Sequence, residues 1–321
     1  MTLGRKFFHN TIVAPTGGAE IQWLVQAGGG GGATSASSGA AGAGAGAGGF
    51  RSSVTNSGGG ASAETAISGV SGDTLTIVVG GASAMDANGN LSSIASSGGN
   101  FTTISCTGGG GGGGQTAARD GGCGGGTIST SVSGAGNGTA GQGFGGGIAQ
   151  GSGTYNGGGG GGTGATGSRT SPFGNGGVGT ISAIIDSDDA SSNSVGEVDS
   201  GNVYFGGGGG GYDQIDNSPN APALGGGGYD QIDNSPNAPA LGGGGNLHGS
   251  PSRAALANSG GGGAAGDGNP RAQVPGASGV VILRMATTAY SAGSTSGSPT
   301  AVTDDSDTVL IFKSSGSFTV G

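Results

Sequence analysis

Charged residues are scarce in this sequence. Nine lysines and arginines and eighteen aspartates and glutamates among 321 residues give a formal net charge of −9. Nucleic acids and anionic membranes attract proteins through clusters of basic residues, and no such cluster is present. The longest apolar run, Val280–Leu283, is far shorter than the roughly 20 residues of a membrane-spanning helix. We therefore expect neither a nucleic-acid partner nor membrane insertion.

Histidine and cysteine are rare as well, with two of each. His9 and His248 are too few for a His-rich metal site, and two cysteines without a nearby histidine do not form a structural zinc site. Cys106 and Cys123 lie 17 positions apart on either side of the longest glycine run. They could form one disulfide across a loop, or remain free.

Motifs for catalysis or cofactor binding are lacking too. Neither Lys6 nor Lys313 follows a glycine, which excludes a phosphate-binding loop of the Gly-Lys-Ser/Thr type. Two acidic clusters, with Asp at 186, 188 and 189 and at 304, 305 and 307, lack the spacing of a calcium loop, so solvated loops are expected there and calcium sites are the alternative. We expect no cofactor, no metal and no catalytic residue, and hence no enzyme.

Glycine dominates what is present, with 87 residues against a usual share of about 7%. The longest run is Gly108–Gly114, and other runs of four or more lie at 28–32, 157–162, 206–211, 225–228, 242–245 and 260–263. Such runs bury no side chains and lose much backbone freedom on folding. They are either flexible linkers, glycine-rich loops of a β protein, or polyglycine-II helices.

A polyglycine-II helix is an extended helix with three residues per turn and no internal hydrogen bonds. Its N–H and C=O groups point outward in three directions, and the lack of Cβ atoms lets neighbouring helices approach and bond sideways. We expect the glycine runs to pack into a polyglycine-II lattice. The alternative is a β protein whose glycine-rich loops are ordered.

Short β-prone segments flank the runs, and no convincing amphipathic helix is found. Strands are predicted at 21–26, 74–79, 91–94, 101–106 and 279–285, and a hairpin at 309–320. Trp23 is predicted to be a core anchor. The fold class is therefore mostly β and irregular, without substantial α-helix. Three segments are expected: an N-terminal β attachment segment at 1–27, a glycine-rich domain at 28–285, and a C-terminal β-hairpin segment at 286–321.

A 17-residue tandem duplication stands out near the end of the glycine-rich region. YDQIDNSPNAPALGGGG occupies 212–228 and recurs unchanged at 229–245. Its Ser-Pro-Asn and Ala-Pro turns indicate exposed loops. Exposed tyrosines offer large contact areas at low entropic cost. The candidate contact residues in the inserts are Tyr155, Phe173, Tyr204, Phe205, Tyr212, Asp213, Gln214, Asn217, Tyr229, Asp230, Gln231 and Asn234, of which Tyr204 and Phe205 could equally cap the lattice.

The order of these features resembles a known group of proteins. WLVQAGGGGG at 23–32, SGDTLTIVVGG at 71–81, CTGGGGGGG at 106–114 and GASGVVILRM at 276–285 are similar to the glycine-rich domain of bacteriophage tail-fibre and receptor-binding tail proteins. In its alternation of glycine runs and short inserts, the chain is also similar to T-even-type phage adhesins with polyglycine-II cores. The glycine blocks are weakly specific, and the ordered flanking strands carry more of the resemblance.

The resemblance implies a virion tail protein that contacts the host surface through variable loops. Its partners would be a host cell-surface protein or glycan, together with other virion tail proteins or copies of itself. The alternative is a structural subunit of an extracellular or virion filament that assembles through its terminal β-segments, because 21–26 and 309–320 could be edge strands that pair between subunits.

Overall fold

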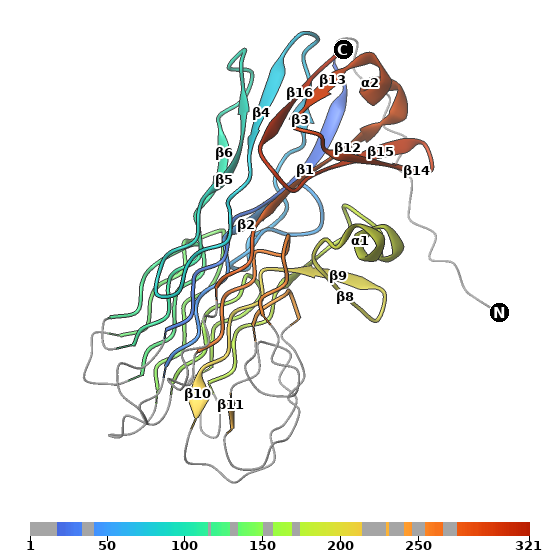
Figure 1. Cartoon of the computed structure of the whole chain (residues 1–321). Helices are drawn as coiled ribbons and strands as arrows, with labels where there is room; N and C mark the ends of the chain where they lie inside the picture. The colour runs from blue at the N-terminus through green and yellow to red at the C-terminus, as the bar shows by residue number, and fades with distance from the viewer. Residues whose placement is uncertain are drawn as a thin grey trace, which may run out of the picture.

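The computed structural model describes residues 18–33, 42–114, 117–128, 134–149, 157–168, 174–213, 229–230, 241–245, 254–265 and 275–321. Two parts follow one another along the long axis in Figure 1: β-sheets at one end, and a bundle of extended segments that continues from their strands. We call the end of this bundle remote from the sheets the distal end.

Two sheets form the β-rich part. The first sheet has the order β14 (Thr300–Asp304), β15 (Asp307–Phe312), β12 (Val280–Ala286), β1 (Glu20–Gln26) and β2 (Phe50–Ser52), with β3 (Ile67–Ser68) also paired to β1. The second sheet has the order β13 (Ser294–Ser296), β16 (Gly316–Thr319), β4 (Thr74–Val78), β5 (Ser92–Ser96) and β6 (Ile104–Cys106).

The first sheet is the middle layer of three. Between the two sheets lies a core that includes Ile21, Trp23, Leu283 and Phe318. Its other face packs against helix α1 (Ser187–Asn193) and a small sheet of β7 (Thr180–Ser182), β9 (Asn202–Phe205) and β8 (Glu197–Asp199). Strands buried on both faces have nearly continuous apolar sequences, which is why β12 reads VVILRMA.

The prediction that Trp23 anchors the core is confirmed. Its side chain is 1% exposed, and its indole N–H donates to the Thr65 carbonyl at 3.0 Å. A second short helix, α2 (Thr287–Ala292), follows β12 and covers the core between the sheets with Tyr290, which stacks on Phe318.

The extended segments form the predicted polyglycine-II lattice. Along 27–33 successive N–H groups turn to three neighbours in rotation: residues 27, 30 and 33 bond to the 43–49 segment, residues 28 and 31 to 87–90, and residue 29 to Ala277. A repeat of three residues with bonds that leave the helix is the signature of polyglycine II. It also satisfies the buried backbone groups without water.

The segment 42–49 lies at the centre of this lattice. It donates to 157–163, 259–265 and 107–113 and accepts from 27–33, 121–127 and 206–211. The segment thus has six neighbouring segments, which is the number that a helix has in hexagonal packing. Every residue of 42–49 is buried.

Strands and lattice helices are continuous with one another (Figure 1). β1 runs into 27–33, β6 into 107–113 and β9 into 206–211, while 42–49 enters β2 and 275–279 enters β12. The sheets therefore set the spacing and direction of the helices that extend from them.

Two expectations from the sequence need correction. β15 and β16 do not form a hairpin, because β15 pairs with β12 and β14, and β16 pairs with β13 and β4 of the other sheet. The segments 21–26 and 309–320 are not edge strands, since β1, β15 and β16 each have a partner on both sides.

Candidate binding surface at the distal end

The distal end is where chain segments leave the lattice and return to it. Ala43, Ile128 and Ala265 cluster there, at the ends of three lattice helices that lie far apart in the sequence. Lattice helices run toward this end up to residues 33, 128 and 265, and lattice helices that run back begin at residues 42, 134 and 275. One end of the molecule thus gathers the ends of several separate connections.

The two copies of the duplication meet at this end. β10 (Tyr212–Asp213) pairs in parallel with β11 (Tyr229–Asp230), so that Tyr212 lies opposite Tyr229 and Asp213 opposite Asp230. β10 follows directly on the lattice helix 206–211, and Figure 1 shows both strands at the distal end. The repeats therefore begin side by side, with identical residues in register.

The lattice helix at the end of the second copy is part of the scaffold. Gly207 and Gly210 donate to the carbonyls of Gly242 and Gly245, and Gly245 donates to Gly262. The buried Glu197 carboxylate accepts from the Gly243 N–H at 2.9 Å. The GGGG that closes the second copy is therefore a fixed element, and the residues before it are the insert.

Half of the twelve predicted contact residues lie outside the described residues: Tyr155, Phe173, Gln214, Asn217, Gln231 and Asn234. For Tyr212, Asp213, Tyr229 and Asp230 the structure describes the backbone strands alone. The geometry brings these last four together and assigns them to the distal end.

Tyr204 and Phe205 lie elsewhere. Both belong to β9, at the end of the lattice nearest the sheets. Phe205 is 0% exposed and stacks on Phe50 with ring centroids 6.0 Å apart. Phe205 is thus a core residue that caps the lattice and has no surface to offer a receptor, while the half-buried Tyr204 is separated from the distal end by the length of a lattice helix.

The two cysteines are free and buried, which corrects the option of a disulfide. The Cys106 thiol donates to the Val25 carbonyl at 3.1 Å, beside the end of β1. Burial raises the pKa of the Cys123 thiol to about 12 and raises the pKa of Cys106 still further. Neither thiol is poised for nucleophilic chemistry, which requires the thiolate.

The acidic clusters also have structural roles that the sequence did not predict. Asp186 caps α1 by accepting from the Asp189 N–H at 2.8 Å. Arg284 pairs with Asp304 at 2.6 Å and with Asp307 at 3.0 Å across the first sheet. Within the described ranges, no three His, Cys, Asp or Glu side chains are placed to hold a metal ion.

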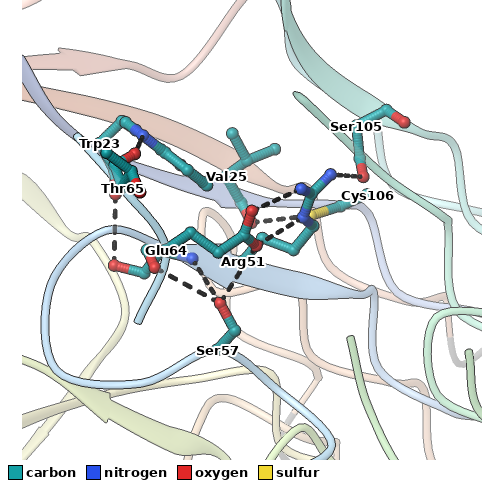
Figure 2. Close-up of polar contacts among 9 residues, drawn as sticks. Trp23, Val25, Arg51, Ser57, Glu64, Thr65, Ser105 and Cys106 are labelled. Atoms are coloured by element: carbon teal, nitrogen blue, oxygen red, sulfur yellow. Dashed lines mark hydrogen bonds and ion pairs between the residues drawn. The ribbon is translucent and has the colours of Figure 1, made fainter. Parts of the chain in front are cut away.

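A further polar cluster surrounds Arg51 on β2 (Figure 2). Its guanidinium forms two bonds to the Glu64 carboxylate, at 2.7 and 2.6 Å, and a third to the Ser105 carbonyl at 3.2 Å. The bond to Glu64 also raises the pKa of Arg51. The pair holds the segment after β2 against that strand, and the bond to Ser105 ties β2 to β6 of the second sheet. Because each charge has a partner of opposite sign, we interpret the cluster as a structural anchor. No spacing in the sequence indicates it.

The fold and surface define a class of protein: a β-sandwich that extends into a polyglycine-II lattice, with the first residues of both repeats paired at the distal end. The comparison with protein families gives the particular family, since the model of a glycine-rich domain matches residues 6–286. The chain belongs to this family of glycine-rich domains. No curated protein and no solved structure gave a match. Among the helices in the described ranges, none is long and apolar enough to cross a membrane.

Proposed function

We propose that the chain is a non-enzymatic phage tail-fibre adhesin. It contacts a protein or glycan of the host cell surface through the distal end, while the sandwich and lattice serve as a scaffold in the virion. The observation that carries the proposal is the pairing of β10 with β11, which puts the first two residues of both copies, a tyrosine in each, at the end remote from the sheets.

The scaffold suits this role because it separates fixed from variable sequence. The lattice helices are buried and bonded to one another, so their residues cannot change freely. A 17-residue unit has been added to one insert without loss of the lattice helix that follows it, 242–245. Binding residues are commonly carried on loops that a rigid scaffold positions.

The alternative function is a filament subunit that assembles through its terminal β-segments. The expectation that supported this alternative does not hold. It required 21–26 and 309–320 to be free edges, whereas the strands there are interior to their sheets. The glycine-rich family itself is compatible with either role, so the adhesin proposal depends on the distal surface.

Deletion of residues 229–245 provides the test. Because the repeats are identical, the shortened chain still contains one complete copy, including a GGGG to occupy the lattice position of 242–245. The deletion therefore removes the β10–β11 pair and preserves the scaffold. We expect purified protein to bind candidate bacterial cells selectively by strain, and the deletion to change which strains are bound or to weaken binding about tenfold or more.

Val70→Ala is the matched control, since Val70 is 44% exposed on the β-rich part, away from the distal end. It should bind cells as the wild type does. Thermal unfolding of all three proteins should be cooperative. Equal binding by wild type and deletion variant, or binding to no strain at all, would overturn the proposed adhesin surface.

A further inference from the structure

The first sheet ends in an open edge at β14. This strand pairs with β15 on one side, and no backbone hydrogen bond within the described residues reaches its other side. Thr300, Ala301 and Thr303 are exposed. An exposed strand edge is a template for pairing with another strand.

The register fixes which groups of β14 are open. Asp304 lies opposite Asp307 across a two-residue turn, Val302 opposite Val309 and Thr300 opposite Ile311. In such a hairpin these alternate pairs exchange the hydrogen bonds with β15. The N–H and C=O groups of Ala301 and Thr303 therefore point away from the sheet, toward solvent.

The usual protections against edge pairing are missing here. Natural edges are blocked by Lys, Pro, a bulge or an unpaired inward charge. The sequence TAVTD of β14 has no Lys and no Pro, and its pairing with β15 is continuous without a bulge. Its one charge, on Asp304, is matched by Arg284. The edge of the second sheet on the same side, β13, is only three residues long.

We propose that β14 pairs antiparallel with β14 of a second copy of this chain, around a twofold axis at Val302. In this register Ala301 lies opposite Thr303 of the partner subunit, so the open groups of each strand meet those of the other. About four backbone hydrogen bonds form, because each of the two symmetry-related pairs exchanges two.

This register brings no like charges opposite one another. Asp304 lies opposite Thr300 of the partner subunit, so no carboxylate faces a carboxylate across the axis. A register shifted by two positions would leave one open residue of each strand without a partner. The symmetric register therefore matches the most groups, and two first sheets join into one continuous sheet.

The symmetry has a consequence for shape. Antiparallel strands are related by an axis perpendicular to their sheet, so the two molecules point in opposite directions along the strands. Since the strands of the first sheet continue into the lattice, the sandwiches meet at the centre and the distal ends face outward. This inference does not depend on the proposed receptor-binding role.

Engineered thiols test the register directly. Val302 faces its own symmetry mate in a non-hydrogen-bonded pair, for which Cα atoms are about 4.5 Å apart, within the range that a disulfide spans. Val302→Cys should give a covalent dimer on mild oxidation. Ala301→Cys is the control, because two such positions are offset by about two residues along the strand, roughly 7 Å, in addition to the strand spacing. The native cysteines are buried and do not interfere.

A proline substitution tests the interface without breaking the fold. The Thr303 N–H points to the open edge, so Thr303→Pro removes a bond to the partner and keeps the ladder with β15. Thr303→Ala retains the N–H and is the matched control. Light scattering over a concentration series should show a dimer for wild type and Thr303→Ala, and a dissociation constant raised about tenfold or more for Thr303→Pro.

The remaining outcomes are decisive as well. A wild type that stays monomeric, with no crosslink through Val302→Cys, would overturn the proposal. A dimer that persists unchanged in Thr303→Pro would place the interface elsewhere. If the chain dimerises only after removal of residues 1–17, its own N-terminal segment occupies the edge and the intact protein is not the proposed dimer. Cell binding need not change in any of these cases, which separates this inference from the adhesin proposal.

Discussion

At the scale of single residues, buried polar groups fix the turns that the glycine-rich chain must make. Asp73 is 6% exposed in the turn before β4. Its carboxylate accepts bonds from Ser96 Oγ at 2.6 Å, Ser97 Oγ at 2.9 Å, the Gly98 N–H at 2.9 Å and Asn100 Nδ2 at 3.0 Å. Burial alone would raise the pKa of Asp73, but these donors outweigh it and lower the pKa well below its usual range.

This carboxylate makes stability depend on pH. Because the folded pKa lies below the unfolded value of about 3.9, the charged form favours folding, and its contribution is present above about pH 4 and lost as pH falls further. We expect Asp73→Asn to lower the free energy of unfolding by about 2 kcal/mol at pH 7 and to flatten its decline below pH 4. Urea unfolding from pH 2.5 to 7 measures both effects. Parallel curves for the two proteins would contradict this role.

The free cysteines lead to a second prediction at this scale. Since both thiols are buried and their pKa values are raised, neither should react with a thiol reagent at pH 8 while the protein is folded. Two thiols should become reactive in 6 M guanidinium chloride, and a reducing agent should leave the melting temperature unchanged. A melting temperature that drops on reduction would instead show that a disulfide forms between them.

At the scale of elements, the lattice requires glycine where helices touch. A Cβ added at Gly160, in the middle of 157–163, would collide with the backbone carbonyl of Ala45 in the central helix. Gly134 is exposed, and a Cβ there would meet nothing within 4 Å. Neither glycine has a positive φ, so the two positions differ in packing rather than in backbone conformation.

We therefore expect Gly160→Ala to destabilise the protein by about 3 kcal/mol, in the upper range for overpacked cores. Gly134→Ala should change stability by less than about 0.5 kcal/mol, as is usual for surface substitutions. Chemical denaturation of both variants gives the comparison. If Gly160→Ala were as stable as Gly134→Ala, the helices around residue 160 would not be packed as the structure has them.

The elements also show how far the sequence could lead. The runs of β-branched residues in 74–79 and 279–285 predict β4 and β12 because branched side chains favour strands whatever lies around them. The same local pattern could not show that the turn at 314–316 carries the chain from one sheet to the other, since a hairpin and a crossing have the same alternation. Helix α1 escaped detection because SDDASSN has one buried residue, Ala190, and no apolar stripe.

The surface residues were harder to predict than the elements. Phe205 and Tyr212 both adjoin the same glycine run, one before it and one after it. The sequence contains no sign of which end of a lattice helix meets the sheets. The structure separates them: Phe205 enters the core beside Phe50, and Tyr212 lies at the distal end. The pairing of the two repeats likewise depends on where the lattice puts their first residues.

At the scale of the whole molecule, sandwich and lattice depend on each other. Glycine runs gain no hydrophobic burial of their own, and their helices start from strands whose spacing the cores maintain. The C-terminal residues contribute six apolar side chains to these cores, each worth about 1.5–3 kcal/mol when fully buried, namely Val309, Leu310, Ile311, Phe312, Phe318 and Val320. Their sum is comparable to the roughly 5–15 kcal/mol by which a domain is stable.

Removal of residues 286–321 should therefore unfold the lattice as well as the sandwich, although the glycine runs themselves remain. In the intact protein, amide hydrogens of 44–49 should exchange only through global unfolding, because each is bonded to a neighbouring helix. In the fragment 1–285 they should exchange at rates close to those of an unfolded chain. Deletion of 229–245 is the control, since it shortens the chain but leaves the cores and the lattice helices in place. Protected amides at 44–49 in the fragment would mean that the glycine-rich region folds alone, as the boundaries drawn from sequence imply. Loss of protection would show instead that the strands must be fixed before the glycines can pack.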